Sequence, residues 1–197
     1  MNQPATENTP DNPELRLFIG IACPLLSKVE NLMKELHSAA LEPGAGIKLV
    51  ATRNLHVTLK FLGSVEASLI RDIANLLDQV AADTSPFDIR LSGIGIFKDA
   101  FWLGVTPCEA LTALAATIDQ QIEPYGFTRR TGPYVPHLTV ARLNKKSLAD
   151  FQSRVRTSNS ERWGNLHVQE IHLYQSRTLP EGAQYSIVHT SKFKPLA

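Results

Sequence analysis

The sequence predicts a bilobal α+β fold in which two antiparallel β-sheets form a central cleft and helices pack on the outside. Three observations lead to this prediction. Amphipathic helical segments alternate with apolar strand segments, some consecutive strands are joined by short hairpin turns, and one strand pattern occurs twice. Hairpins favour antiparallel sheets over a doubly wound parallel sheet. The repeated pattern predicts two lobes related by a pseudo-two-fold axis.

The chain divides into a tail and one domain. Residues 1–14 are polar, include Pro4, Pro10 and Pro13, and show no apolar period, which predicts a disordered N-terminal tail. Residues 15–197 are numerous enough to bury a substantial core, and we expect them to form a single bilobal domain.

In the first part of the domain, apolar runs and helical periodicity alternate. Within the first helix, apolar residues recur every three or four positions at Leu25, Val29, Leu32 and Leu36. Clusters of Pro and Gly separate the segments. The predicted elements are strand 15–22, helix 24–40, the short extended segment 47–50, strand 55–63 and a helix with its apolar face at 69–80.

In the second part, Pro86 precedes a long strand, and a turn at Lys98 and Asp99 predicts a hairpin. A third helix is stopped by Pro124 and Gly126, and a loop rich in Pro and Gly leads into the next strand. The predicted elements are strands 87–97 and 101–105, helix 107–122, loop 129–136, strand 136–143, helix 145–156, and strands 166–176 and 184–193.

Composition argues against several classes of protein. The 20 Lys and Arg against 19 Asp and Glu give a net charge of +1, so no global charge favours nucleic acid or a membrane as partner. Cys23 and Cys108 form no CxxC or paired spacing, which indicates neither a disulfide framework nor a zinc site. The apolar run 17–26 is too short to span a bilayer. We expect a cytoplasmic monomer with no membrane partner.

The repeated pattern is His-x-Thr-x, where x is aliphatic, and it begins at His56 and again at His137. Because side chains alternate between the two faces of a strand, His56 shares a face with Thr58, and His137 shares a face with Thr139. The aliphatic residues take the other face and point into a core. Two such strands facing each other make a cleft with two imidazoles and two hydroxyls.

This set of side chains suits metal-free chemistry at phosphorus. Imidazole titrates near neutral pH, so one histidine can deprotonate an attacking water while the other protonates the departing oxygen. The threonine hydroxyls can donate hydrogen bonds to the non-bridging phosphate oxygens. In-line displacement needs the nucleophile and the leaving group on opposite sides of phosphorus, and two opposed strands match that symmetry.

One His-x-Thr in a strand is a weak signal, because half-exposed histidines are common. Two copies with matched flanks are harder to explain by packing, so we interpret them as a site. A metal site is the weaker alternative, since no His or Cys lies at a close ligand spacing around either copy. We expect no cofactor.

The two copies belong to a wider pattern. Together with Arg-Leu-Phe-Ile at 16–19, Phe-Leu-Gly at 61–63 and Leu-Tyr-Gln-Ser-Arg at 173–177, they resemble the two-histidine phosphoesterase superfamily. Within it, the chain is most similar to the RNA 2′,3′-cyclic phosphodiesterases, also called 2′-5′ RNA ligases. The resemblance covers residues 15–193, and the paired motif is its specific part.

The resemblance implies a bilobal α+β fold and metal-independent opening of an RNA 2′,3′-cyclic phosphate end to a 2′-phosphomonoester. It implies that His56 donates the proton to the 3′ oxygen and that His137 is the proton acceptor that activates water. Thr58 and Thr139 then bind the phosphate. The residues themselves are symmetric and do not assign the acid and the base.

Other residues near the two copies have weaker claims. Arg142 either adds positive charge near the phosphate or is an exposed strand-end arginine, and strict alternation keeps it off the histidine face unless the strand bulges. Arg130 and Tyr134 lie on the loop before the second copy, where they either contact RNA phosphate and base or form a plain surface loop. Lys60 has the parity of the first histidine, so it either edges the cleft or is a solvated lysine, and we favour the solvated lysine.

Two other functions stay open. A binding module would hold RNA ends or nucleotide phosphates without turnover, although a binder needs no pair of proton-transfer groups. Ligation would use the same residues, with an RNA 5′-hydroxyl replacing water to form a 2′-5′ linkage. Water is the more abundant nucleophile, so hydrolysis is the primary hypothesis.

Overall fold

The computed structural model describes residues 13–148, 151, 161–180 and 182–194. The strands are β1 (Glu14–Ala22), β2 (Ile47–Leu49), β3 (His56–Glu66), β4 (Phe87–Phe97), β5 (Ala100–Val105), β6 (His137–Leu143), β7 (Arg162–Val168), β8 (Glu170–Leu179) and β9 (Gly182–Lys192). The helices are α1 (Ser27–Ala40), α2 (Ile70–Ala82) and α3 (Glu109–Gln121), with short 3-10 turns at 52–54, 67–69 and 123–125.

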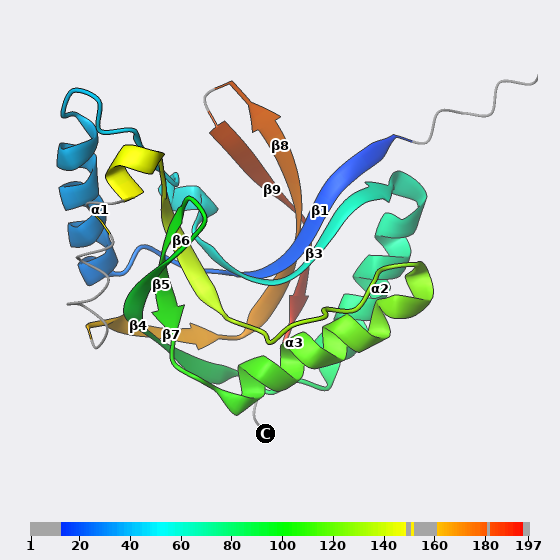
Figure 1. The fold of residues 1–197 in the computed structure, drawn as a ribbon. Helices are drawn as coiled ribbons and strands as arrows, with labels where there is room; N and C mark the ends of the chain where they lie inside the picture. The colour runs from blue at the N-terminus through cyan, green and yellow to red at the C-terminus, as the bar shows by residue number, and fades with distance from the viewer. Residues whose placement is uncertain (1–12, 149–150, 152–160, 181, 195–197) are drawn as a thin grey trace, which may run out of the picture.

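The strands form one antiparallel sheet in the order β7-β4-β5-β6-β3-β1-β8-β9, and β2 pairs with the C-terminal part of β6, residues 141–143. The sheet is strongly curved, so that its two halves rise on either side of a concave surface (Figure 1). The α+β class and the antiparallel pairing are confirmed. The prediction of two separate sheets is corrected, because β3 and β6 pair with each other and join both halves into one sheet.

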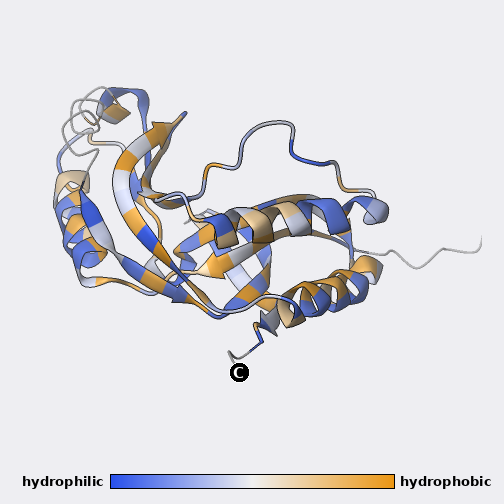
Figure 2. Cartoon of the chain, turned by 90° about the horizontal axis from the view of Figure 1, so that it is seen from below, coloured by the Kyte–Doolittle hydropathy of each residue, from blue (hydrophilic) through white to orange (hydrophobic). Residues whose placement is uncertain are grey.

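The helices cover the convex side of this sheet. α3 packs against β3, α2 packs against β8 and β9, and α1 packs against β2 and β7. Figure 2, which views the molecule from below, shows hydrophilic and hydrophobic residues interleaved along each helix. The apolar face of each helix is buried against the sheet, which leaves the opposite, concave face of the sheet open. The buried helix positions include Val29, Leu32, Leu36, Ile73, Leu77, Leu111, Leu114 and Ile118.

The strand predicted at 166–176 is two strands. β7 ends at Val168 and pairs with β4, whereas β8 begins at Glu170 and pairs with β1, so the two belong to opposite ends of the sheet. Buried positions alternate through Leu166 and Val168, and the spacing slips by one residue before Ile171. This slip marks the break at Gln169, which the prediction of one strand at 166–176 did not include.

Smaller differences concern the ends of elements. α1 begins at Ser27, three residues later than predicted, and Glu14 belongs to β1 instead of the tail. The rest of the predicted tail, residues 1–12, lies outside the described residues. Of the helix predicted at 145–156, residues 145–148 and 151 are helical, and the remainder also lies outside the described residues. In the described part of the chain, no helix has both the length and the apolar character needed to cross a membrane.

Candidate active site

The two His-x-Thr-x strands lie side by side at the centre of the sheet. Val57 of β3 is paired antiparallel with Leu138 of β6, and both side chains are fully buried on the helix side. Continued by one residue in each direction, this register sets His56 level with Thr139, and Thr58 level with His137, on the concave face. Side chains opposite each other in such a ladder have Cβ atoms about 5 Å apart. The prediction of strands that face each other across a cleft is therefore corrected to neighbouring strands that share one face.

Each histidine is oriented by the same backbone hydrogen bond. Nδ1 of His56 lies 2.7 Å from the carbonyl oxygen of Asn54, and Nδ1 of His137 lies 2.8 Å from the carbonyl oxygen of Val135. A carbonyl only accepts, so Nδ1 carries the proton and Nε2 is left for proton transfer. In the neutral ring Nε2 is a base, and in the charged ring it is an acid.

The surroundings of the two histidines differ. The ring of His56 lies 4.7 Å from Phe18, 5.2 Å from Tyr185 and 6.0 Å from Tyr174, measured between centroids. Burial lowers the pKa of His56, the nearby His137 lowers it further, and the bond to the Asn54 carbonyl opposes both effects. His56 is therefore biased toward the neutral form in the free protein.

His137 has an aromatic neighbourhood of its own. Its ring lies 5.4 Å from Phe97 and 5.7 Å from Trp102, and these two rings contact each other at 4.9 Å. Phe97 is 43% exposed. Both histidines are thus flanked by aromatic side chains on the concave face, one set from each half of the sheet.

Both motif strands bulge at the fourth position of the motif. Against β1, Thr58 pairs with Gly20 and Lys60 with Ile19, so Leu59 is the extra residue. Against β5, Thr139 pairs with Trp102 and Ala141 with Phe101, so Val140 is the extra residue in the second copy. A bulge shifts the alternation by one residue, so the positions that follow change faces. The correspondence between the copies therefore extends beyond the residues that match in sequence.

The first bulge turns Lys60 toward the helices. The side chain is buried, forms an ion pair with Asp119 of α3, and donates a hydrogen bond to the carbonyl oxygen of Thr128 at 2.6 Å. The interpretation of Lys60 as a solvated lysine is wrong. Lys60 does not edge the cleft either, because the bulge at Leu59 breaks the alternation that would put it on the histidine face.

The second bulge turns Arg142 onto the histidine face. The sequence predicted that Arg142 would lie on this face only if the strand bulged. The side chain is exposed and forms an ion pair with Asp99 at 2.8 Å. Its charge is thus partly neutralised in the free protein.

Arg130 and Tyr134 lie on the segment that leads into β6, residues 126–136, which we call the approach loop. The Arg130 guanidinium donates to the Leu59 carbonyl at 2.6 Å and sits 4.6 Å above the Tyr134 ring. The Tyr134 hydroxyl donates to the Thr58 carbonyl at 3.0 Å. Burial raises the pKa of Tyr134 well above its usual value, so the hydroxyl stays a donor. Both side chains contact the backbone of the first motif strand, which a plain surface loop does not explain.

A sequence profile of the 2′-5′ RNA ligase superfamily matches residues 28–178. The chain belongs to this superfamily. It is 33% identical over 180 residues to the RNA 2′,3′-cyclic phosphodiesterase of Archaeoglobus fulgidus, covering 87% of this chain and 96% of that protein. It is 32% identical over 184 residues to the protein of the same name from Methanocaldococcus jannaschii, covering 88% of this chain and 98% of that protein.

Solved structures agree with this membership. The crystal structure of E. coli LigT complexed with ATP is 26% identical and superposes with a TM-score of 0.68, covering 92% of this chain and 99% of that one. TT0787 of Thermus thermophilus is 23% identical, with a TM-score of 0.71 and coverage of 92% and 99%, and shows the shared fold. The curled antiparallel sheet is therefore the fold of this superfamily.

Sequence reasoning missed the aromatic residues around the histidines of this superfamily member. In β1, every position from Leu17 to Ile21 is buried, so alternation gave no sign that Phe18 faces the site. Tyr174 lies in the segment 173–177 that contributed to the resemblance, and this was the available signal. Tyr185 and Trp102 became visible only with the pairing of their strands.

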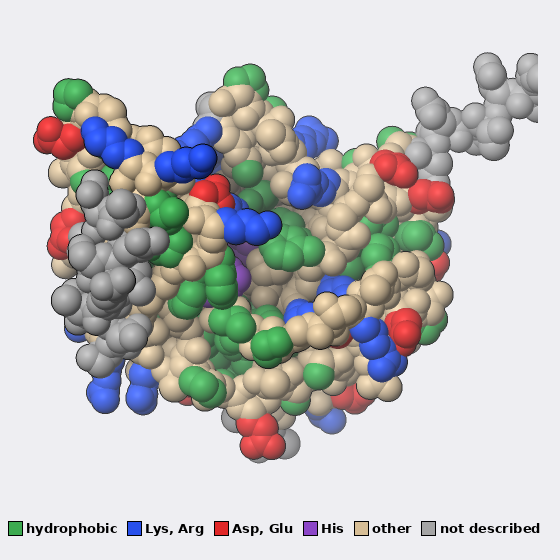
Figure 3. Space-filling model, in the orientation of Figure 1, with side chains coloured by type: hydrophobic (Ala, Val, Ile, Leu, Met, Phe, Trp, Pro, Cys, Tyr) green, Lys and Arg blue, Asp and Glu red, His purple; other side chains and the backbone are tan. Residues whose placement is uncertain are grey.

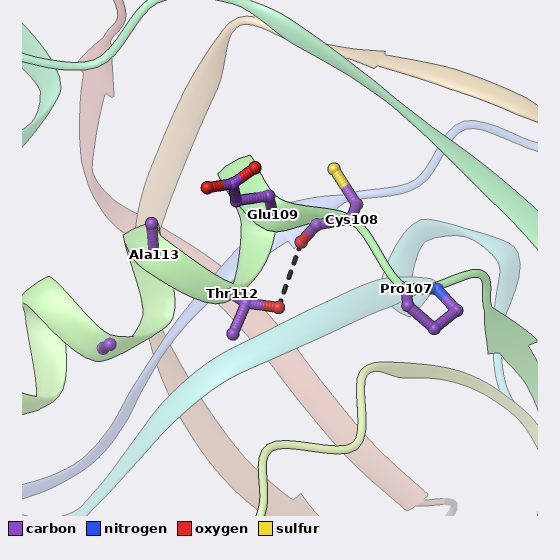
Figure 4. A pocket seen from close by; sticks show the side chains of 6 residues that line it. Pro107, Cys108, Glu109, Thr112 and Ala113 are labelled. Carbon is purple, nitrogen blue, oxygen red and sulfur yellow. Dashed lines mark hydrogen bonds between the residues drawn. The ribbon is translucent and has the colours of Figure 1, made fainter.

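The concave face is a hollow in the space-filling view, with a histidine at its floor and hydrophobic, Lys and Arg side chains around it (Figure 3). A separate, open depression of about 460 Å³ lies at the start of α3, where the Thr112 hydroxyl donates to the Cys108 carbonyl at 3.0 Å (Figure 4). Its lining residues belong to neither motif strand and include no histidine. The candidate site is therefore the part of the concave face where β3 and β6 meet, which we call the seam.

Across the described residues, no group of three or more His, Cys, Asp or Glu side chains is arranged to hold a metal ion.

Proposed function

We propose that this protein hydrolyses RNA 2′,3′-cyclic phosphate ends to 2′-phosphomonoesters by metal-independent acid–base catalysis. One observation carries the proposal: two histidines whose Nδ1 atoms bond to backbone carbonyls, which leaves Nε2 for proton transfer, share the concave face at the β3–β6 seam with the two motif threonines. The name shared by curated relatives at 32–33% identity, RNA 2′,3′-cyclic phosphodiesterase, supports a hydrolase of this class.

The proposed reaction is an in-line displacement at phosphorus. Nε2 of neutral His137 accepts a proton from water as its oxygen attacks, and the bond between phosphorus and O3′ breaks. Nε2 of protonated His56 gives its proton to O3′, so the product carries a 2′-phosphate and a 3′-hydroxyl. The hydroxyls of Thr58 and Thr139 donate to the non-bridging oxygens, where negative charge increases in the transition state.

The protonation of His56 depends on the substrate. Burial lowers its pKa in the free protein, whereas a proton donor has to be charged when the substrate is bound. A cyclic phosphodiester is an anion, and an anion close to an imidazole favours the protonated ring. We therefore propose that binding of the phosphate raises the pKa of His56 and so prepares the acid.

The aromatic rings beside the histidines support an RNA end as substrate. Bases of unpaired RNA are recognised by stacking on aromatic side chains, and a terminal cyclic phosphate leaves its own base free to stack. Phe61 and Phe97 are exposed on the two sides of the seam, at 71% and 43%. Arg142, on the same face, provides a positive charge for a neighbouring phosphate.

The test is turnover of a short oligoribonucleotide that ends in a 2′,3′-cyclic phosphate, with EDTA in excess. We expect conversion to a phosphomonoester, and no reaction of the same oligonucleotide ending in a 2′,3′-diol. His167→Ala is the matched control, since that exposed histidine pairs with Asp88 away from the motif strands, and it should keep full activity. Tight binding of the cyclic-phosphate oligonucleotide without product over long incubation would establish a binding module and contradict the proposal.

A further inference from the structure

A buried ion pair lies directly beneath the first motif strand. Lys60, at the bulge of β3, and Asp119, on α3, are 7% and 9% exposed and bond to each other. Burial raises the pKa of Asp119, but the bonds from Lys60 and from the Arg130 amide outweigh this effect, so the net pKa lies below its usual value. Asp119 is therefore a charged acceptor inside the protein.

Both partners of this pair also hold the approach loop. Oδ2 of Asp119 accepts a hydrogen bond from the Arg130 backbone N–H at 2.9 Å. Nζ of Lys60 donates to the Thr128 carbonyl at 2.6 Å. The Arg130 side chain returns to the Leu59 carbonyl. One carboxylate and one ammonium thus fasten the loop to α3 and to the bulge of β3.

From this attachment the loop runs to the second motif. Tyr134 bonds to the carbonyl of Thr58, and the carbonyl of Val135 orients the His137 ring. The Val105 amide donates to the carbonyl of Pro136 at 3.2 Å, which holds the same end of the loop from the β5 side. Each step from Asp119 to His137 is therefore a hydrogen bond or a short length of backbone, the longest being the one from Arg130 to Tyr134.

We propose that Asp119 and Lys60 are positioning residues that hold the approach loop on β3 and so fix His137 relative to His56 and Thr58. The inference rests on the proposed function for its kinetic consequence, because proton transfer and phosphate binding need both motifs in one geometry. A misplacement of about 1 Å can cost about 100-fold in rate. A charged pair suits this task because its hydrogen bonds are directional and so hold the loop in one position, whereas apolar contacts are not directional.

The test compares four variants with the wild-type protein, the fourth being the conservative Asp119→Glu. Asp119→Asn keeps the shape of the carboxylate but removes its charge and one acceptor. The double variant Lys60→Met with Asp119→Leu removes both charges together and so leaves no unpaired buried ion, which keeps the fold testable if the single variant fails to fold. Arg129→Gln is the matched control, because Arg129 lies on the same loop and forms an exposed pair with Glu123.

The readouts are kcat and KM on the cyclic-phosphate oligonucleotide, thermal unfolding, and the NMR signals of the histidine rings. We expect Asp119→Asn and the double variant to lower kcat at least about tenfold, with a smaller change in KM. The signals of His137 should shift or broaden, while those of His56 and His167 stay in place. Asp119→Glu should recover part of kcat, and the control should match the wild-type protein.

Two results would overturn the positioning role. One is a folded double variant with wild-type kcat, and the other is an equal disturbance of His56 and His137, which would indicate general loosening. The NMR measurement needs no turnover. If the wild-type protein proves inactive on cyclic phosphate, the proposed function fails while the positioning of His137 is still decided by its signals.

Discussion

Val57 of β3 lies opposite Leu138 of β6, and around this buried pair the two His-x-Thr-x strands present matched side chains on the concave face. The histidines are 81 residues apart in sequence, 137 minus 56, yet belong to neighbouring strands. The site thus lies where the two halves of the sheet join. A change that moves one half of the sheet relative to the other should therefore lower the proposed activity before it lowers the stability of the fold.

Removal of either histidine should abolish most of the activity. We expect His56→Ala and His137→Ala each to lower kcat/KM on the cyclic-phosphate oligonucleotide by about 10³-fold, because each loses one proton-transfer group. Steady-state kinetics with EDTA present measures this. Full activity in either variant would show that the acid–base pair is assigned wrongly.

The threonine hydroxyls should contribute to the transition state more than to substrate binding. Thr58→Val and Thr139→Val keep the shape of the side chain and remove the donor, and we expect kcat to fall about 100-fold in each with little change in KM. Thr→Ser variants at the same positions keep the hydroxyl and serve as controls. An effect confined to KM would show that the hydroxyls bind the ground state equally well.

The lowered pKa of His56 predicts a specific pH dependence. As the proposed acid, His56 must be protonated, so kcat/KM, which reports the free enzyme, should fall as pH rises through a pKa below 6.5. The fall in kcat, which reports the bound state, should occur at higher pH because the phosphate raises that pKa. NMR titration of His56 with and without inorganic phosphate gives the same comparison directly. An unchanged His56 pKa on phosphate binding would contradict the proposed preparation of the acid.

The Asp119 carboxylate should stabilise the fold in a pH-dependent way. Its pKa is lowered in the folded protein, so its contribution is present above the ordinary value of 3.8 and is lost as pH falls through the folded pKa. Urea unfolding should show Asp119→Asn less stable by about 3 kcal/mol at pH 7, because Lys60 is then buried without its partner. The difference between the two proteins should shrink as the pH falls below 3.8, where the unfolded chain takes up the proton first. A constant difference between pH 7 and pH 3 would rule out this role of the charge.

Arg142 should affect substrate binding through its ion pair with Asp99. Arg142→Ala should raise KM several-fold, whereas Asp99→Asn should lower KM because it frees the guanidinium for phosphate. Both effects should shrink at high salt, where exposed charges are screened. Opposite signs in the two variants are the expected signature. An unchanged KM in Arg142→Ala would place Arg142 outside the binding surface, and a rise in KM in Asp99→Asn would show that the ion pair does not compete with the phosphate.

Sequence alternation correctly placed each histidine on one face with the threonine of its own motif, and it failed one or two residues later. Lys60 and Arg142 both exchange faces because Leu59 and Val140 are bulged. A bulge depends on how the strand pairs with β1 or β5, and that pairing is not encoded in the local apolar pattern. The same limit explains why two sheets were predicted. The contact between Val57 and Leu138 is long-range, and only the folded arrangement shows it.

The central claim is that the seam opens the cyclic phosphate on the 3′ side, and ³¹P NMR of the reaction product tests it most directly. An oligonucleotide ending in 2′,3′-cyclic phosphate, incubated with the protein and EDTA, should give a single new resonance matching a 2′-phosphomonoester standard. A 3′-phosphate product would show that the leaving oxygen lies on the other side of phosphorus. Retention of the cyclic resonance under these conditions would contradict metal-independent hydrolysis at this site.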